Sequence, residues 1–329
     1  MPKKGKFRVV FAASARYKDD CLNDQLLQGP EHINSLQGIL MRFRNHSVAF
    51  SCDVEKMFYN LSVPPEDRDF LRFLWLDEKS NVVECRMTVH TFGATSSPAV
   101  ATYGLRRIAK DNQQKSAEAA DFICSNFYVD DGIVSVPNDA AAIKLIHDAR
   151  DLCSTYNIRL HKFVSNSANV LSSLPSTERK VQEEDISLLN GNATYRTLGM
   201  EWNVSTDSIK FSHDFKDKQT TKRVMLSTIA QLFDPLGLLA SLTLKGKILL
   251  QEACRRNLTW DQDVCDDLRN KWTLWTENLA LLPEVNIPRC TKPQGWEELK
   301  TTEVHYFSDA SLSGYGACAY VRRTKCTVL

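Results

Sequence analysis

Short apolar runs predict that the first two thirds of the chain mixes strands with amphipathic helices. The run from Val48 to Val54 predicts a buried strand with Asp53 near its end. A carboxylate at the end of an apolar strand is costly unless it is paired, caps a helix or binds a metal. Aspartate is also a common N-cap for a following turn, so both interpretations of Asp53 stay open.

The stretch from Phe127 to Val136 consists of two short β-runs joined by acidic residues. Asp131-Gly132 is a strong hairpin signal and predicts a turn at these two positions. Turn chemistry alone would account for both residues. Adjacent carboxylates at a hairpin tip, Asp130 and Asp131, can alternatively hold a divalent metal, because Mg²⁺ prefers hard oxygen ligands.

The remaining pattern predicts further helices, hairpins and connections. The predicted helices are residues 33–43, a helix starting at Pro64, residues 98–110, 139–156, and three later helices near 216–233, 241–256 and 263–281. The predicted strands are residues 71–76 paired with 82–89, then 158–164, 195–202, 209–211, 305–311 and 319–321. Residues 112–120 are polar and are expected at the surface, whereas residues 165–187 are expected to form an exposed connection. Pro283, Pro288 and Pro293 mark a linker.

Composition restricts the class of protein without selecting one. The 329 residues are 43% hydrophobic and 25% charged, with a net charge of +1, so there is no global basic excess that would favour nucleic acid. Ten cysteines form no C-x-x-C pair and seven histidines show no H-x-x-x-H spacing, which argues against a zinc ribbon or a redox motif. No apolar run approaches the length of a membrane span, and no signal-peptide core follows the N-terminus.

Two groups of basic and aromatic residues leave alternatives open. Cations around Val9 to Phe11, among them Arg8, could lie against phosphates or simply solvate an edge strand. The tryptophans Trp260, Trp272 and Trp275 could stack on bases, although tryptophan at helical spacing more often belongs to a core.

Three segments resemble the motifs of a known family. The strand ending in Asp53, the loop from Phe92 to Pro98 and the hairpin at Tyr128-Val129-Asp130-Asp131 have the order and approximate spacing of motifs A, B and C of a reverse transcriptase palm. The detail is most similar to the BEL/Pao class of LTR retrotransposons. Runs that resemble this class are Arg8-Val9-Val10-Phe11, Leu22-Asn23, Gly29-Pro30, Phe163-Val164-Ser165-Asn166, Leu198-Gly199 and Leu232-Phe233-Asp234-Pro235-Leu236-Gly237. Phe307 to Ser311, with Gly314 and Gly316, resembles the first hairpin of an RNase H domain.

The resemblance implies an α+β fold with a ferredoxin-like antiparallel palm sheet. The expected parts are partial fingers (1–47), a palm with the polymerase site (48–212), thumb and connection helices (213–283), a linker (284–303) and a truncated RNase H start (304–329). The implied function is that of the RNA-directed DNA polymerase core of a retrotransposon Pol polyprotein. The implied partners are an RNA template, a DNA primer, dNTPs and other Pol segments, without a membrane, in intracellular, cytoplasmic particles.

The resemblance also implies a two-metal site. Two Mg²⁺ ions, with Mn²⁺ as the substitute, would be bound by Asp53, Asp130, Asp131 and the backbone carbonyl of Val54. Charge and alignment carry phosphoryl transfer, which needs little covalent help. Because three clustered carboxylates repel one another, the site is expected to be strained without metal.

Further roles follow for residues around the nucleotide. Phe58 stands five residues after Asp53, where the family has an aromatic gate that excludes a ribose 2′-hydroxyl by clash; ordinary core packing is the alternative. Arg8 resembles the fingers arginine that contacts phosphates, and Lys162 resembles the lysine that protonates pyrophosphate. Gly93 belongs to the loop expected under the nucleotide.

The sequence departs from the family pattern at three places. Ala12 and Ala13 stand where an acidic residue is typical. The chain is expected to begin inside the fingers, and it carries one RNase H carboxylate, Asp309, so RNase H activity is expected to be missing. Two other functions remain as alternatives: an inactive remnant that at most binds nucleic acid, and a viral RNA-templated RNA polymerase, against which Phe58 argues.

Overall fold

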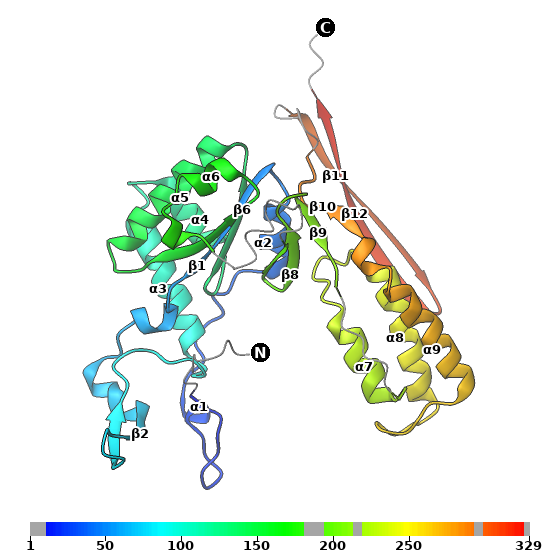
Figure 1. Cartoon of the computed structure of the whole chain (residues 1–329), viewed down its shortest axis with the longest axis horizontal. Helices are drawn as coiled ribbons and strands as arrows, with labels where there is room; N and C mark the ends of the chain where they lie inside the picture. The colour runs from blue at the N-terminus through cyan, green and yellow to red at the C-terminus, as the bar shows by residue number, and fades with distance from the viewer. Residues whose placement is uncertain (1–10, 181–193, 213–218, 293–298, 326–329) are drawn as a thin grey trace. The chain divides into compact units, whose positions relative to one another are not determined.

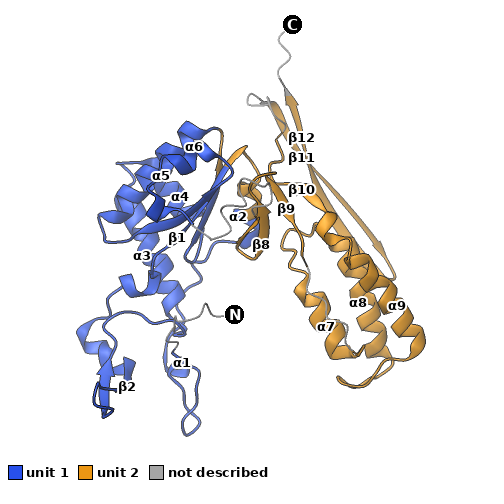
Figure 2. Ribbon diagram, viewed as in Figure 1, with its two compact units in different colours: residues 1–39, 49–134, 138–181 blue, residues 40–48, 135–137, 182–329 orange. Residues whose placement is uncertain are grey.

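A computed structural model describes residues 11–180, 194–212, 219–292 and 299–325. The chain divides into two compact units, each assembled from separate stretches of sequence (Figure 2). Unit 1 comprises residues 1–39, 49–134 and 138–181, and unit 2 comprises residues 40–48, 135–137 and 182–329.

A four-stranded sheet with the order β4-β5-β1-β6 lies mainly in unit 1 (Figure 1). Its strands are β1 (Val48–Val54), β4 (Phe127–Tyr128), β5 (Asp131–Val136) and β6 (Leu160–Ser165). Strands β1 and β6 are antiparallel, as are β4 and β5. Aromatic side chains fill the core beside the sheet, because Phe50 packs edge-on against Phe122 at 5.5 Å and Phe122 lies 5.1 Å from Phe127.

Helices cover this sheet and a separate hairpin extends from the unit. The helices are α3 (Ser97–Asp111), α4 (Ala117–Ser125), α5 (Asp139–Ser154) and α6 (Ala168–Ser172), of which α4, α5 and α6 are grouped together in Figure 1. The hairpin is β2 (Arg72–Leu76) with β3 (Val82–Arg86), preceded by the short helices α1 (Leu22–Gln25), η1 (Met57–Asn60) and η2 (Pro65–Leu71). The predicted hairpin and the predicted helix at residues 139–156 are confirmed.

Unit 2 contains a second antiparallel sheet with the order β10-β9-β8-β7. Its strands are β7 (Thr194–Thr197), β8 (Met200–Asn203), β9 (Ser208–Lys210) and β10 (Asn286–Pro288). Trp202 and Ile209 are fully buried, and Phe43 at the end of α2 (Leu36–Phe43) meets Trp202 edge-on at 5.0 Å.

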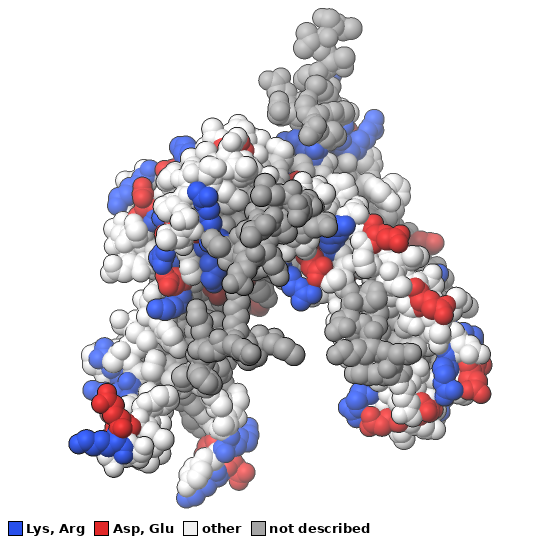
Figure 3. All heavy atoms as spheres, viewed as in Figure 1, with Lys and Arg blue, Asp and Glu red and all other residues white. Residues whose placement is uncertain are grey.

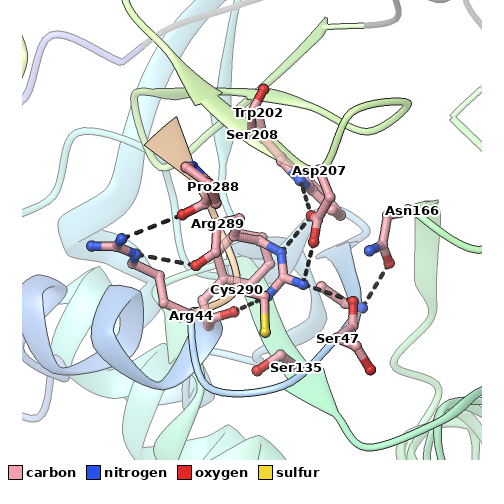
Figure 4. A network of polar contacts seen from close by, with 12 residues as sticks. Arg44, Ser47, Ser135, Asn166, Trp202, Asp207, Ser208, Pro288, Arg289 and Cys290 are labelled. Carbon is pink, nitrogen blue, oxygen red and sulfur yellow. Dashed lines mark hydrogen bonds and ion pairs between the residues drawn. The ribbon is translucent and has the colours of Figure 1, made fainter. Parts of the chain in front are cut away.

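A buried arginine holds this part of unit 2 together (Figure 4). Arg289 is 0% exposed and forms a two-pronged ion pair with Asp207, with Nε–Oδ1 and Nη2–Oδ2 distances of 2.6 and 2.7 Å. It also donates to the backbone carbonyls of Phe43, His46 and Ser47. Every charged nitrogen therefore has an acceptor, which is the condition under which a buried guanidinium is tolerated.

Three helices and a long hairpin complete unit 2. The helices are α7 (Lys222–Gln231), α8 (Ala240–Arg255) and α9 (Asp266–Leu279), and the hairpin is β11 (Leu299–Ser311) with β12 (Gly314–Lys325). Helices α8 and α9 approach closely because Gly246 leaves room for the ring of Trp275, whose Nε1 donates to the Leu242 carbonyl at 2.9 Å. Trp272 and Trp275 are core residues, whereas Trp260 is 48% exposed and lies under the cations of Lys222 and Arg223.

Several boundaries predicted for unit 1 were wrong. Helix α2 begins at Leu36 rather than Ile33, because the Ser35 hydroxyl accepts from the Gly38 amide and caps the first turn. The prediction that residues 112–120 lie at the surface is confirmed for residues 113–115, 117 and 118, whereas Asn112, Ala119 and Ala120 are buried and Ser116 caps α4.

The segment 165–187 was predicted to be exposed. It contains α6, capped by Ser167, and the 3₁₀ turn Ser176–Glu178 with Glu178 buried; its residues after 180 lie outside the described ranges. The polar side chains here include caps and ion-pair partners as well as exposed residues.

Two predictions were also wrong in unit 2. Residues 195–202 form two strands rather than one, because Leu198 and Gly199 take positive φ and turn the chain back. The segment 284–303 is not simply a linker, since it supplies β10 and the buried Arg289.

Surface charge and helix length add two observations. On the face drawn in Figure 3, basic and acidic side chains are interspersed within each unit, in keeping with the net charge of +1. Within the described ranges, every helix is too short or too polar to cross a lipid bilayer.

Replacing Arg289 with alanine is expected to lower the free energy of unfolding by about 3–5 kcal/mol, because Asp207 and three carbonyls lose their shared donor. The matched control is Arg223→Ala, which breaks an ion pair with Asp261 whose side chains are 64% and 72% exposed. That control should cost little, because solvent screens an ion pair between two exposed side chains. Urea denaturation followed by tryptophan fluorescence measures both, and equal losses would contradict the importance of the buried network.

Candidate active site

Asp53 lies in β1 next to a break in the pairing between β1 and β6. Ser51 pairs with Val164 but Asp53 pairs with His161, so one residue of β6, Lys162, is left over as a β-bulge. Lys162 has φ +54°, the left-handed region that bulges exploit. The bulge carries the Lys162 ammonium to Asp53, with Nζ 2.5 Å from Oδ2. Asp53 lies within β1 and is ion-paired, so its place at the end of an apolar run does not require the N-cap alternative.

The other two carboxylates stand on the β4–β5 hairpin, whose turn differs from the prediction. Phe127 pairs with Gly132 and Tyr128 with Asp131, so the two turn residues are Val129 and Asp130. The prediction of a turn at Asp131-Gly132 was wrong, because both residues belong to β5. Gly132 is instead required for packing: a Cβ there would come within 2.5 Å of the Phe127 ring.

Val129 bears unusual backbone strain for its type. Its φ is +56°, at the first turn position, where hairpins with positive φ generally use glycine. A β-branched residue in this region costs on the order of 1–3 kcal/mol unless its surroundings impose it.

The turn is fastened to the end of β1. The Val54 amide donates to the Asp130 carbonyl at 2.8 Å, next in sequence to Asp53. The carboxylates of Asp53, Asp130 and Asp131 are close enough for their charges to interact. The structure thus brings Asp53 close to Asp130 and Asp131, although it precedes them by more than seventy residues of chain.

The electrostatics of the cluster follow from this crowding. Burial raises the pKa of Asp131 to about 7, and the negative charges of Asp130 and Asp53 act in the same direction. The positive charge of Lys180 opposes the increase. Asp131 therefore keeps its proton to near neutral pH.

The carboxylates of Asp53, Asp130 and Asp131 are ligands that suit a hard divalent cation, although their present positions are not those of a formed metal site. Three carboxylates meeting at strand ends are oxygen ligands of the type that Mg²⁺ and Mn²⁺ take. In the described ranges, however, no three histidine, cysteine, aspartate or glutamate side chains already converge on one ion position. The Lys162 ammonium is paired with Oδ2 of Asp53. This ion pair has to open before Oδ2 can bind a metal cation.

Phe58 and Gly93 lie in two neighbouring segments. Phe58, in η1, is 8% exposed and packs edge-on against Phe92 with ring centroids 4.7 Å apart. Gly93 has φ +94°, and a side chain there would collide with the backbone carbonyl of Phe11. Asn23 fixes this loop by donating to the Gly93 carbonyl at 3.0 Å and accepting from the Thr95 amide at 2.8 Å. Asn23 belongs to the Leu22-Asn23 run noted in the sequence, but its contact with this loop was not predicted.

Two further predicted residues lie elsewhere. Arg8 falls outside the described residues. Asp309 lies in β11 opposite Gly316 and lines a cleft of about 640 Å³ in unit 2, together with Leu244 and Lys247 of α8. Among the described residues that line this cleft, Asp309 is the single carboxylate.

Comparison with known structures identifies the class of fold. A solved structure described as a foamy viral protease–reverse transcriptase in complex with double-stranded DNA matches with a TM-score of 0.60 and 12% sequence identity. The match covers 100% of this chain and 51% of that one, so the chain spans about half the length of its structural relative. At this identity the likeness shows the fold alone: α+β, with antiparallel sheets, similar to that of a retroviral enzyme.

The sequence itself gives a narrower relationship for part of unit 2. Residues 221–327 match the profile of the Pao retrotransposon-like RNaseH-like domain. This match supports a relationship to retroelement Pol proteins and covers α7 to β12. No curated protein sequence matches the chain.

The proton on Asp131 predicts how stability depends on pH in metal-free buffer. Because its pKa of about 7 lies above that of an unfolded aspartate, near 3.9, the folded state binds more protons between these values. This contribution is complete below about pH 4 and is lost as the pH rises through about 7, with a slope of at most about 1.4 kcal/mol per pH unit.

Urea unfolding in EDTA across this range measures the slope, and Asp131→Asn should remove this part of it. Asp77→Asn, in the β2–β3 turn, is the control and should leave the decrease in place. An unchanged slope in the Asp131 variant would contradict the assignment.

Proposed function

We propose that this chain is the RNA-directed DNA polymerase core of a BEL/Pao-type retrotransposon. The observation that carries the proposal is the meeting of Asp53, Asp130 and Asp131 where β1 joins the β4–β5 turn. A fold similar to a viral reverse transcriptase and a Pao RNaseH-like profile on residues 221–327 support it. An RNA template, a DNA primer and dNTPs are the proposed partners.

In this proposal two divalent ions are held by Asp53, Asp130, Asp131 and the carbonyl of Val54. When bound, two Mg²⁺ ions would supply activation of the primer 3′-hydroxyl and neutralisation of the departing pyrophosphate. Asp131 has to release its proton before it can serve as a ligand, so cation binding and proton release are coupled. Binding would offset the burial and the neighbouring negative charges that hold that proton in place.

Lys162 has two proposed states. Without nucleotide it neutralises Asp53 through the 2.5 Å ion pair. Once that pair opens, its ammonium is available to protonate pyrophosphate, and its bulged position leaves the side chain half exposed. The same residue would thus stabilise the empty site and act on the leaving group.

The remaining assignments concern nucleotide selection. Phe58 is proposed as the gate against a ribose 2′-hydroxyl, with Phe92 fixing its ring. Gly93 allows the loop to lie close to neighbouring backbone, and Arg8 is proposed to contact phosphates.

A second candidate function is an inactive remnant that binds nucleic acid without extending a primer. The observation that favours it is the absence, in the described ranges, of three ligating side chains converging on one ion position. The Asp53–Lys162 pair could equally be the final state of a site that has lost its cation. Binding of Mn²⁺ to the purified chain distinguishes the two candidates.

Asp130→Asn is expected to lower Mg²⁺-dependent primer extension on an RNA template by at least about a thousandfold, because a ligand charge is lost without a change in size. The matched control is Asp77→Asn, which alters an aspartate in another hairpin turn, where it accepts from the Lys79 and Asn81 amides. If both variants extend primers equally well, Asp130 is only a turn residue and the polymerase proposal fails.

Phe58→Ala is expected to raise the ratio of ribonucleotide to deoxyribonucleotide incorporation at least about tenfold, because the clash with the 2′-hydroxyl is removed. The ratio is measured by single-nucleotide extension. A smaller amount of folded protein lowers both rates equally and leaves their ratio unchanged. Phe70→Ala, at an exposed phenylalanine of η2, is the control. An unchanged ratio would leave Phe58 as a core residue, and a wild type that already prefers ribonucleotides would favour an RNA polymerase.

A further inference from the structure

The hairpin that carries Asp130 and Asp131 is too short to hold its own turn. Strand β4 has two residues, and its ladder with β5 consists of the pairs Phe127–Gly132 and Tyr128–Asp131. Short two-stranded hairpins are marginal in water, and this one also contains the strained Val129. Something outside the ladder has to fix β4.

Asn126 extends the ladder by one pair at the base of the hairpin. The Ile133 amide donates to the Asn126 carbonyl at 3.0 Å, and the Asn126 side-chain amide donates back to the Ile133 carbonyl at 3.1 Å. Asn126 is buried, so these bonds are shielded from water. This fixes the side of β4 that faces β5.

Asn34 fixes the other side of β4. Strand β4 is at the edge of the described sheet, where backbone groups would otherwise lack partners. The Asn34 side-chain amide donates to the Phe127 carbonyl at 2.9 Å and to the Cys124 carbonyl at 3.0 Å. The Asn34 side chain therefore supplies a hydrogen bond that a neighbouring strand would otherwise make on this side of β4. It also joins β4 to the end of α4.

Asn34 is itself held in position. It precedes α2, whose cap is Ser35, so its side chain is not used by that helix. Its Oδ1 accepts from Nη2 of Arg106 on α3 at 2.5 Å. One amide thus links three segments of unit 1 to the strand that leads into Asp130 and Asp131.

We propose that Asn34 is a positioning residue for the polymerase carboxylates: it holds β4 from outside, so that the strained turn presents Asp130 and Asp131 to Asp53. This inference rests on the proposed function, and it assigns a role that the motifs themselves do not contain. Residues that orient metal ligands typically change metal affinity by about 10- to 100-fold when replaced.

The experiment compares Asn34→Ala and Asn34→Asp with Asn112→Ala in the full chain. Asn112 is the matched control, because its buried side-chain amide also makes two hydrogen bonds in unit 1, to the Ile108 carbonyl and the Tyr156 hydroxyl. Both Asn34 variants should weaken Mn²⁺ binding in calorimetry about tenfold and lower kcat about as much, with KM for template–primer within about twofold. Asn34→Asp keeps the shape of the side chain but removes the amide donor, so a role in filling space predicts wild-type behaviour for it.

The outcomes separate the inference from the proposed function. If the Asn34 variants lose stability as Asn112→Ala does but keep Mn²⁺ affinity and kcat, the positioning role is overturned. If the wild type binds no Mn²⁺ and Asp130→Asn changes nothing, the proposed function has failed. Amide hydrogen exchange then tests separately whether Asn34 holds β4 in place. Faster exchange of the Ile133 and Val54 amides in Asn34→Ala than in Asn112→Ala supports it, and equal rates overturn it.

Discussion

Like charge confined to the ends of adjacent strands is the constraint on which unit 1 depends. Asp53, Asp130 and Asp131 would repel one another if all were ionised, and burial makes that repulsion stronger than it would be in water. Two features reduce this repulsion: Asp131 retains a proton, and the Lys162 ammonium pairs with Asp53. Both are charges that a bound metal could replace.

The backbone is strained at two positions around the cluster, Val129 and Lys162. Both adopt the left-handed conformation although neither is glycine. They stand on opposite sides of the cluster, one in the β4–β5 turn and the other in the bulge of β6. Strain of this kind persists where the surroundings over-determine it, and the Val54–Asp130 bond provides one such restraint. Backbone outliers of this kind cluster at functional sites.

Local pattern was enough to predict the strand bearing Asp53, the hairpin bearing Asp130 and most helices, because apolar spacing and turn residues act over a few positions. It could not predict the bulge at Lys162, which depends on pairing between strands more than a hundred residues apart. The turn was placed two residues late, since the Phe127 ring, and not the turn, requires Gly132. The burial of Arg289 was missed for a similar reason, because a cation near prolines resembles a linker until its distant acceptors are known.

The Arg289 network also has a consequence for synthesis on the ribosome. The carbonyls of His46 and Ser47 are made 243 and 242 residues before the guanidinium that satisfies them. Until that donor emerges they must remain bonded to water, whereas all the segments of unit 1 have been made by residue 181. Unit 2 is therefore the last to acquire its native contacts during translation, and a nascent chain arrested before residue 289 carries a finished first unit beside an unfinished second one.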